Sequence, residues 1–487
     1  MIRVNGVLSL ILIGIMSQIS QAQEIGDTIV VLRETKMKRG QDVVQTLRAG
    51  EFFRVEDVDS TWLWVSAKNT GWIAKPDVST PKHAVAYFSK RIEEVSDDVG
   101  ACVARGNARL ASRQIEEAIA DYDEALRLDP KMIEALVSRA NARAEMRQFE
   151  KALADLHQAL GLDPHSVDAL FLRGTLLAER GQFEKAAADL SECLGHCPGY
   201  AGAYRNRAGL WLETHDFERA FADADQATEL DPRNSSAFSA RGAALLGAGK
   251  VEEALVDLDE SLNLDPNNRH AHIMRGHARC HKKEFQQSLV DLTAALKLHQ
   301  DAPALVLRGD IRAELGEFEK AIADYTAALK LDPADMQALH SRSSAWLYER
   351  NYAKALADVS EVLRQYPNDV FARRRRAFIR AAAPDPKFRD GKQAVVDAMH
   401  ACDLTQWKQP EAISVLAAGY AEIGDFAKAI EFESKAIKLA TDKGLQQELT
   451  RTLELYKQRL PYRFESEDRA VIPTAGRAQA KPTTNRR

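Results

Sequence analysis

Histidine and cysteine side chains could give this 487-residue chain a metal site, because imidazole and thiolate are preferred ligands of Zn²⁺. His270, His277 and His281 lie in one segment, RHAHIMRGHARCHKKEF, with Cys280 beside them. His277 and His281 have the four-residue spacing of two ligands on one helix face. Three histidines spread over about three turns of one helix cannot close tightly around one ion. Zinc or copper binding is therefore the alternative, and we expect no metal site.

The five cysteines could instead form disulfides. Their odd number and irregular spacing argue against a disulfide framework. Cys193 and Cys197 are four residues apart near the end of one predicted helix, where an intra-helix bridge or a metal pair is the alternative to simple packing. We expect both to be packing residues, since a free cysteine behaves as a small apolar side chain.

No catalytic motif is present: the sequence lacks a GxSxG elbow, an HExxH helix, a P-loop and a dinucleotide fingerprint. We therefore expect no catalytic residues, no enzyme activity and no cofactor. The net charge of -5 gives no broad basic surface, so we also expect no nucleic-acid partner.

Residues 1–22 have the parts of a secretory signal peptide. Arg3 precedes an apolar run from about Val7 to Met16, and small residues before Gln23 fit a cleavage site. The run is shorter than the roughly 20 apolar residues of a spanning helix, so an uncleaved membrane anchor is the less favoured alternative. We expect an exported protein, periplasmic or extracellular, with no membrane span after cleavage.

Residues 25–78 have the pattern of a small all-β domain. Short β-branched and aromatic runs, TIVVL, VVQTL, FFRVEDV, WLWVS and GWIAK, are separated by turn residues. The stretch WLWVSAKNTGWIAKPDV resembles a bacterial SH3-like domain, in which a tryptophan hairpin followed by GWI recurs. The resemblance implies a small β-barrel of a kind that often binds peptides or cell-wall fragments.

The tryptophans of this domain, Trp62, Trp64 and Trp72, are candidates for a binding surface. The alternative is that they are structural. Strand alternation puts Trp62 and Trp64 on one face, and a barrel this small must fill its interior with large rings. We expect at least two of the three to be mainly structural.

From residue 99 onward the sequence repeats with a period of 34 residues, the sign of a helix-turn-helix solenoid. Each of the ten repeats, which together span residues 99–442, is numbered from its own position 1. The first residues of the repeats are 99, 133, 167, 201, 235, 269, 302, 336, 370 and 410. The ninth repeat contains a lengthened turn at 383–392, which is either functional or a tolerated insertion.

Three positions recur in the repeats. Position 8 is always glycine, alanine or serine, and position 20 is alanine in nine of the ten repeats. We expect helix A and helix B of a repeat to cross there, because overpacking a close contact costs about 1–3 kcal/mol. Position 32 is proline in seven of the first eight repeats, just beyond helix B, which it prevents from continuing.

This combination resembles the tetratricopeptide repeat family, over about 340 residues. The resemblance implies a right-handed superhelix of helix pairs with a concave groove, most often used to hold a peptide or partner protein. We expect an all-α solenoid of about ten helix pairs preceded by a small all-β SH3-like barrel. Residues 79–97 should form a capping helix and linker, 443–464 a closing helix, and 465–487 a disordered tail.

A charged pair recurs inside the repeats. Position 7 is arginine and position 23 is aspartate in the first nine repeats, whereas the tenth has Leu416 and Phe432. The capping helix has Tyr87 at the equivalent of position 23 although Arg105 follows it, so the pair belongs to one repeat. We predict an Arg–Asp ion pair between helix A and helix B in most of repeats one to nine. Its role would be orientation more than stability, since exposed pairs contribute about 0–1 kcal/mol and buried ones can break even.

Positions 2, 5, 9, 12 and 13 of helix A form most of the concave surface in the tetratricopeptide family, and we call this surface the groove face. It is acidic in repeats one to four and cationic and aromatic in repeats eight and nine. Such a gradient could fix the direction of a bound extended peptide; drift on a solvated face is the alternative. The candidate groove residues are Asn107, Asn141, Phe171, Arg205, His277, His340, Tyr348, Phe371, Arg374 and Phe378.

We expect an exported interaction scaffold that binds a protein or peptide in its groove. The alternative is a cell-envelope protein that binds peptidoglycan through the SH3-like domain and recruits an enzyme through the repeats.

Overall fold

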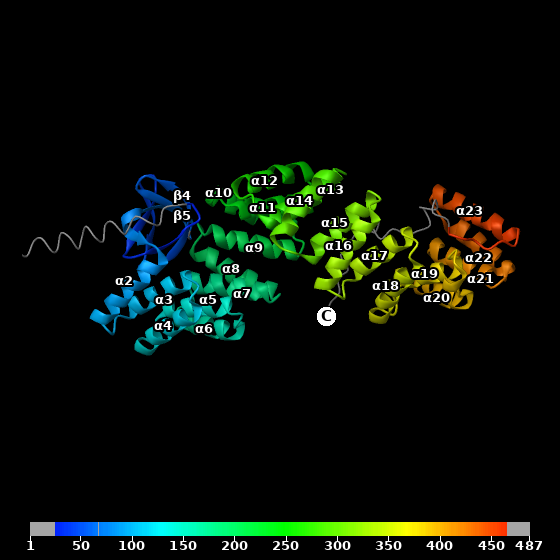
Figure 1. Ribbon diagram of the computed structural model, residues 1–487. Coiled ribbons are helices and arrows are strands. Elements are labelled where there is room, and N and C mark those ends of the chain that lie inside the picture. The colour runs from blue at the N-terminus through cyan, green and yellow to red at the C-terminus, as the bar shows by residue number, and fades with distance from the viewer. Residues whose placement is uncertain (1–24, 67, 465–487) are drawn as a thin grey trace, which may run out of the picture. The chain divides into compact units, whose positions relative to one another are not determined.

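The computed structural model describes residues 25–66 and 68–464, and the predicted signal peptide and tail lie outside them. An antiparallel sheet is followed by 22 α-helices in the described chain (Figure 1). The chain divides into two compact bodies, an N-terminal body that ends at Ala278 and a C-terminal body that begins at Arg279. None of the helices described combines the length and apolarity that crossing a bilayer requires.

The sheet has seven strands in the order β3-β2-β6-β5-β4-β1-β7, and its neighbouring strands are antiparallel. The strands are β1 Thr28–Val31, β2 Thr35–Arg39, β3 Asp42–Leu47, β4 Phe52–Asp59, β5 Trp62–Ser66, β6 Thr70–Ala74 and β7 Val78–Ser79. A 3-10 turn, η2 (Lys75–Asp77), precedes β7. β2 and β7 carry no aromatic or long apolar run, which is why the sequence pattern did not indicate them.

The sheet curls around an aliphatic core to which every strand contributes. The cluster consists of Ile29, Val31, Met37, Leu47, Val55, Leu63, Val65, Ile73 and Val78. Trp62, Trp64 and Trp72 are half-buried on the opposite face. The expectation that large rings fill the interior is therefore wrong, because Leu63 and Val65 take the inward positions of β5.

The helices alternate as helix A and helix B of the ten repeats, between α2 (Pro81–Glu94) and α23 (Lys443–Lys457). The A helices, each starting at the first residue of its repeat, are α3 Val99–Ala111, α5 Ile133–Glu145, α7 Val167–Glu179, α9 Ala201–Glu213, α11 Ser235–Gly247, α13 Arg269–His281, α15 Ala302–Glu314, α17 Met336–Tyr348, α19 Val370–Ala382 and α21 Pro410–Glu422. The B helices are α4 Ile115–Leu128, α6 Phe149–Leu162, α8 Phe183–His196, α10 Phe217–Leu230, α12 Val251–Leu264, α14 Phe285–Leu298, α16 Phe318–Leu331, α18 Tyr352–Gln365, α20 Gly391–Leu404 and α22 Phe426–Leu439.

The crossing of helices A and B depends on position 8, as the sequence predicts. A Cβ atom on Gly106 would lie 2.5 Å from Cε1 of Tyr122, and one on Gly242 would lie 2.8 Å from Cγ of Leu258. Tyr122 and Leu258 both stand at position 24, so this position fills the space that position 8 leaves. Position 20 is fully buried beside it, as in Ala118.

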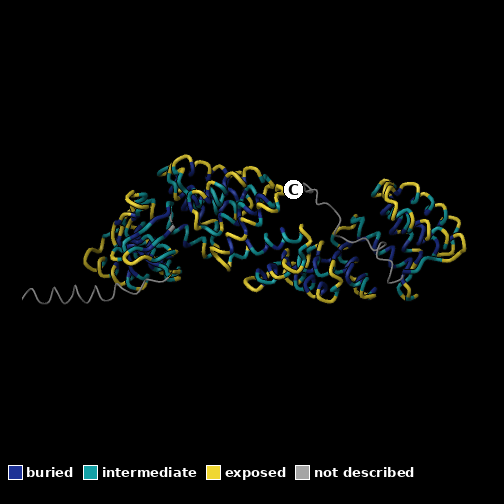
Figure 2. The backbone as a smooth tube through the Cα atoms, turned by 90° about the horizontal axis from the view of Figure 1, so that it is seen from above, coloured by how far each residue is buried: buried dark blue, intermediate teal, exposed yellow. Residues whose placement is uncertain are grey.

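In each body, a buried cluster extends through several neighbouring repeats. One buried cluster runs through α5 to α9, and another runs through α17 to α23. Figure 2 shows exposed residues at the helix turns and buried residues between the helices of each body. Because one helix pair cannot bury its apolar face alone, each repeat depends on its neighbours.

The lengthened turn of the ninth repeat is held against its surroundings. It contains η3 (Pro386–Phe388), and Phe388 packs against Tyr352 with ring centroids 5.6 Å apart. Arg389 donates from Nε to Glu422 at 3.0 Å. The turn therefore joins repeats eight and ten as well as the helices of its own repeat.

Candidate functional site

Eight of the nine predicted Arg–Asp pairs join helix A to helix B. In the first repeat Arg105 donates from Nη2 to Asp121 at 2.7 Å, and this hydrogen bond raises the pKa of Arg105. The other pairs are Arg139–Asp155, Arg173–Asp189, Arg207–Asp223, Arg241–Asp257, Arg308–Asp324, Arg342–Asp358 and Arg376–Asp397. The ninth pair, Arg275 and Asp291, falls on either side of the boundary between the two bodies.

These aspartates also accept hydrogen bonds from position 11 of helix A. Arg143 donates to Asp155 at 2.6 Å, and Trp211 donates from Nε1 to Asp223 at 2.9 Å. The sequence did not reveal this partner, because position 11 varies between arginine, tryptophan and leucine.

The arginine at position 7 also reaches the preceding repeat. Arg139 donates from Nη1 to Asp123 at 2.6 Å, and Arg241 donates from Nη1 to Asp225 at 2.7 Å. Asp123 and Asp225 stand at position 25 of the preceding helix B. The prediction that pairing stays within one repeat is thus right for position 23, but the same guanidinium also ties neighbouring repeats together.

The groove face of repeats three to six in the N-terminal body contains a cavity of about 410 Å³. Arg205, Asn206, Glu213 and His270 are among its lining residues. Burial lowers the pKa of Arg205, whose described hydrogen-bond partner is Oδ1 of Asn206 at 3.3 Å. Burial also lowers the pKa of His270, whose Nδ1 lies 2.5 Å from the Ser239 hydroxyl. The cavity therefore presents a half-buried cation and amide groups to a ligand.

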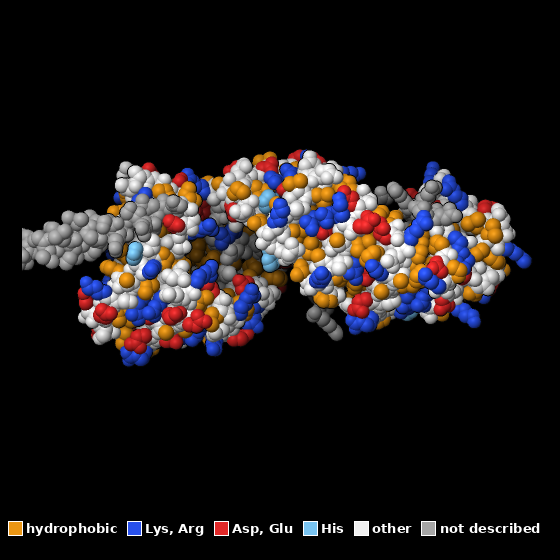
Figure 3. All heavy atoms as spheres, in the orientation of Figure 1, with side chains coloured by type: hydrophobic (Ala, Val, Ile, Leu, Met, Phe, Trp, Pro, Cys, Tyr) orange, Lys and Arg blue, Asp and Glu red, His pale blue; other side chains and the backbone are white. Residues whose placement is uncertain are grey.

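The outer surface near α4 and α6 differs from this cavity. Figure 3 shows acidic and basic side chains interspersed over these helices. Such a surface is typical of a solvated helix face.

The β-sheet region packs on the N-terminal repeats through ion pairs to groove-face positions. Lys68 Nζ lies 2.8 Å from Asp168, and Arg48 pairs with Glu134. Both acids stand at position 2 of their repeats. Part of the predicted acidic groove is therefore occupied by the chain's own β-sheet region.

The tryptophan face of the sheet also contributes to this contact. Trp64 has Arg39 of β2 on one side and Arg233 of the α10–α11 loop on another, with guanidinium carbons 6.0 and 5.6 Å from the ring centroid. Arg233 also pairs with Asp57, which lowers the pKa of Asp57. Trp62 is contacted by Lys38 at 5.7 Å, and Trp72 packs edge-on against Trp64.

In the C-terminal body, three candidate groove residues form one cluster. His340 and Phe371 pack edge to face with ring centroids 4.8 Å apart, and the Arg374 guanidinium lies 5.5 Å from the Phe371 centroid. Arg375, which the sequence did not single out as a groove residue, lies 4.2 Å over the same ring and donates to the His340 carbonyl at 2.7 Å. Burial lowers the pKa of Arg375 to about 9. The cationic and aromatic end of the groove is thus largely packed into the repeats.

The candidate groove residue Phe378 is covered by the chain itself. Residues 461–464 leave α23 and cross repeats nine and ten, where the Phe464 amide donates to the Ala382 carbonyl at 3.0 Å. The Phe464 ring packs edge-on against Phe378 at 5.9 Å and is only 6% exposed. Arg463 donates to the Ala381 carbonyl at 3.1 Å. The closing helix predicted to reach 464 ends at Lys457, and the following segment lies on positions 9, 12 and 13 of helix A.

Comparison with known families decides what these repeats are. Two tetratricopeptide repeat models match, one at residues 99–132 and the other at 137–201, 211–269, 273–336 and 306–370. Together the matches cover more than half of the chain. The chain belongs to the tetratricopeptide repeat family. Its fold implies a protein–protein interaction scaffold.

Several solved structures are similar to parts of this chain. YrrB, described as a TPR protein with an unusual peptide-binding site, is 24% identical over 39% of this chain and 97% of its own, with a TM-score of 0.32. A tetratricopeptide repeat protein from Parabacteroides merdae is 18% identical over 48% of this chain and 93% of its own, with a TM-score of 0.41. The APC/C hetero-tetramer Cut9-Hcn1 is 15% identical over 76% of this chain and 81% of its own, with a TM-score of 0.45. No curated protein matches the chain.

The remaining candidate residues of this tetratricopeptide repeat protein are dispersed. Asn107 accepts a hydrogen bond from the Tyr122 hydroxyl at 2.7 Å, and Phe171 packs against Tyr200. Tyr348 stacks on Phe318 with centroids 4.4 Å apart, and it also interacts electrostatically with Arg375 of the His340 cluster. Asn141 and His277 are half-buried on α5 and α13.

The cysteines are free thiols in the described chain. Cys193 is fully buried in the apolar cluster of α5 to α9, and burial raises its pKa to about 12. A thiol that deprotonates so reluctantly is a poor metal ligand or nucleophile at neutral pH. This agrees with its interpretation as a packing residue.

Proposed function

We propose that this protein is an exported, non-catalytic scaffold that binds an extended segment of a partner protein on the groove face of its repeats. The carrying observation is that its own residues 461–464 lie on that face in repeats nine and ten, with a backbone hydrogen bond from Phe464 to Ala382. Because the helix A positions of this face accommodate one extended segment and offer it a backbone hydrogen-bond acceptor, we expect the same face of other repeats to accommodate an extended segment of a partner protein.

The cavity of repeats three to six is the proposed site for the partner. Arg205 is half-buried, its described hydrogen-bond partner is an amide oxygen, and the nearby Asp231 charge only partly offsets the burial that lowers its pKa, so a further anion would stabilise its charged form. A carboxylate of the partner would supply the missing charge, while Asn206 and His270 would fix its position through hydrogen bonds. The partner is therefore expected to present an acidic group to this cavity.

Site-specific photo-crosslinking in cells tests this proposal. A photoreactive residue replaces Glu213, an exposed residue at the cavity, or Val256, which is 70% exposed on helix B. We expect one specific adduct at position 213 that disappears in the Arg205→Ala background, and none at 256. Equal labelling at the two positions would contradict groove binding.

The export part of the proposal rests on the sequence of residues 1–22 alone, so it needs its own test. We expect the mature protein in the exported fraction to begin at Gln23, as determined by mass spectrometry of its N-terminal peptide. A chain that retains Met1 and stays in the cytoplasm would contradict export while leaving the groove proposal untouched.

Peptidoglycan binding by the β-sheet region is the second function considered. It is less favoured because Trp64 lies against Arg233 of the repeats, which leaves less of the aromatic face open. Retention of the full chain on purified cell wall, lost in Trp62→Ala, would favour it over the first.

A further inference from the structure

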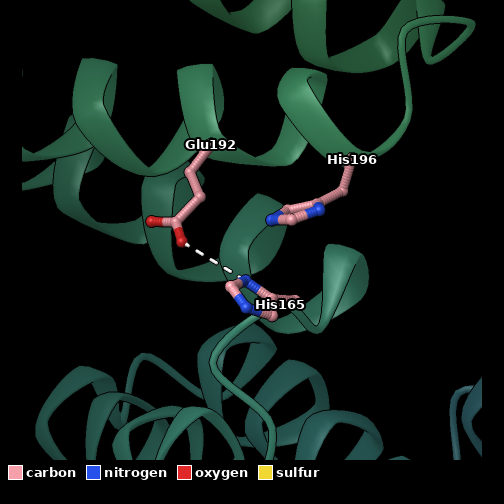
Figure 4. A group of neighbouring side chains, drawn as sticks. All are labelled: His165, Glu192 and His196. Atoms are coloured by element: carbon pink, nitrogen blue, oxygen red, sulfur yellow. Dashed lines mark ion pairs between the residues drawn. The ribbon is translucent and has the colours of Figure 1, made fainter.

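Three metal-ligating side chains meet where repeats two and three join. His165 lies in the loop between α6 and α7, and Glu192 and His196 lie on α8. One ligand atom from each lies within 4.8 Å of the other two, and His165 Nδ1 is 3.8 Å from Glu192 Oε1. Figure 4 shows Glu192 and His196 pointing from α8 toward His165. All three side chains are exposed.

Local structure fixes the positions from which these side chains extend. Glu192 and His196 are four residues apart, so they share one face of α8. The Asp163 carboxylate accepts the backbone amide of His165 at 3.0 Å, which holds the loop in a turn. The two histidine rings lie 4.5 Å apart at an interplanar angle of 50°. Only side-chain rotation is needed to bring the ligands closer.

The repeat pattern does not account for either histidine. His196 stands at position 30, where eight of the ten repeats have leucine. His165 stands at position 33, where the other repeats of the N-terminal body have lysine, glycine, arginine or asparagine. Two separate departures from the repeat therefore meet at one point, although packing of the solenoid requires neither.

We propose that His165, Glu192 and His196 form a site for a divalent transition-metal ion, with Zn²⁺ as the best-matched ion. Two imidazoles and one carboxylate are a ligand set that Zn²⁺ accepts, with a fourth position open to water or to a group from a partner. Ligand atoms about 2.0–2.1 Å from a tetrahedral ion lie about 3.3 Å apart, so the His165–Glu192 separation needs to shorten by about 0.5 Å and the other separations by up to about 1.5 Å. Exposed side chains can make this adjustment freely.

The ion would join the loop before α7 to α8, and so connect two successive repeats through a metal bridge for which the described residues offer no second group of ligands. This site is separate from the Arg205 cavity, and its existence does not depend on the proposed function. It also differs from the cysteine pair and the three-histidine segment singled out from the sequence.

Isothermal titration calorimetry with ZnSO₄ on the metal-free full chain at pH 7.5 tests the site. We expect saturable binding that weakens at least tenfold in His196→Leu and in Glu192→Gln. His196→Leu introduces the residue that eight repeats already carry, so it should leave the fold intact, as circular dichroism would verify. The matched control is His157→Leu, which replaces an exposed histidine on α6 outside the cluster. This variant should bind Zn²⁺ as the parent chain does.

A second readout assigns the binding to these ligands. Co²⁺ substitution should give visible absorption bands that are lost in His196→Leu and retained in His157→Leu. Absence of saturable Zn²⁺ binding, or binding that His196→Leu leaves unchanged, would overturn the proposal.

Discussion

Burial and pairing together set the charge state of the ionisable side chains in the repeats. The aspartates at position 23 are buried, yet each described pair gives them two or three charge-assisted hydrogen bonds, as Asp155 receives from Arg139 and Arg143. Glu433 in the tenth repeat is equally buried, but among the described residues the Ser414 hydroxyl, at 3.1 Å, is its only hydrogen-bond donor. Burial raises the pKa of Glu433 to about 8, so it is protonated at neutral pH.

The first prediction concerns Glu433. Its folded-state pKa lies above the unfolded value, so its contribution to stability is fully present below about pH 4.5 and is lost as pH rises through about 8. Thermal unfolding of the C-terminal body should therefore shift to lower temperature as pH rises from about 5 to about 8, at up to about 1.4 kcal/mol per pH unit, and level off above that range. Glu433→Gln should flatten this dependence, whereas the exposed Glu431→Gln should not. An unchanged slope in Glu433→Gln would refute the assignment.

The second prediction compares two aspartates of the recurring pair. Asp155 accepts from two arginines, whereas Asp189 accepts from Arg173 alone. Removing one partner of a buried pair costs about 3–5 kcal/mol, so both alanine variants should be strongly destabilised. Asp155→Ala should lower the free energy of unfolding more than Asp189→Ala, because it leaves two guanidinium groups without their carboxylate instead of one. Hydrogen exchange of the amides in α6 and α8 measures the difference, and equal losses would show that Arg143 contributes nothing.

Among single residues, the contacts that could be predicted from the sequence are those between positions that keep the same residue type in nearly every repeat. Arginine at position 7 and aspartate at position 23 occur together nine times and vanish together in the tenth, so their contact could be inferred. The tenth repeat replaces the ion pair by an aromatic stack of Phe432 on Tyr420, with centroids 5.5 Å apart. Arg205 could be placed on the groove face, but its cavity could not, because the lining depends on side-chain conformations in four neighbouring repeats.

Positions 8 and 24 face each other where helices A and B cross, and glycine at position 8 stands opposite leucine as well as tyrosine, as Gly242 does opposite Leu258. Glycine stands at position 8 in both repeats that have tyrosine at position 24, namely Gly106 with Tyr122 and Gly309 with Tyr325. Where position 24 is Leu156, position 8 is Ala140. The small residue was predicted from recurrence, but its partner at position 24 was not, because that position varies in size.

The contact between positions 8 and 24 gives the third prediction. Gly106→Ala would place a methyl group 2.5 Å from the Tyr122 ring and should destabilise the first repeat by about 1–3 kcal/mol. Adding Tyr122→Leu reproduces the Ala–Leu pair of the second repeat and should recover most of that loss. Denaturant unfolding of the single and double variants measures the coupling. If the losses in free energy of unfolding from the two substitutions were additive, positions 106 and 122 would not be in contact.

The turn between helices A and B was harder to predict. Position 15 has positive φ in nine repeats, but it is glycine in only four of them, Gly181, Gly249, Gly316 and Gly424. Arginine, histidine or lysine holds the same left-handed conformation in the other five, as Arg147 does at φ 60°. Because the repeat forces this geometry on residues that disfavour it, the residue types alone did not mark the turn.

At the scale of each body, segments distant in the sequence occupy the groove face. The ion pairs Arg48–Glu134 and Lys68–Asp168 join residues 86 and 100 positions apart. The sequence identified both acids as groove residues, but it could not indicate that the β-sheet region of the same chain supplies their cations.

The fourth prediction tests this docking. A zero-length carbodiimide crosslinker should join Lys68 to Asp168, whose atoms lie 2.8 Å apart, and mass spectrometry should detect the linked peptides. Asp168→Asn removes the reactive carboxylate and should abolish the link. The yield should fall at about 1 M salt, where the Debye length is about 3 Å and exposed pairs are screened. A yield that salt leaves unchanged would mean that packing, rather than charge, holds the β-sheet region in place.

Residues 461–464 have a consequence for any molecule that uses repeats nine and ten. Because the segment is tethered a few residues beyond α23, its local concentration at Phe378 is on the order of millimolar. A ligand with micromolar intrinsic affinity for repeats nine and ten would have to compete with this tethered segment. Its measured affinity would then be weaker by a factor set by the equilibrium constant for the binding of Phe464 to the groove face. Ending the chain after Gln458 would therefore increase the measured affinity of such a ligand for repeats nine and ten, although the contacts that the ligand makes would stay the same.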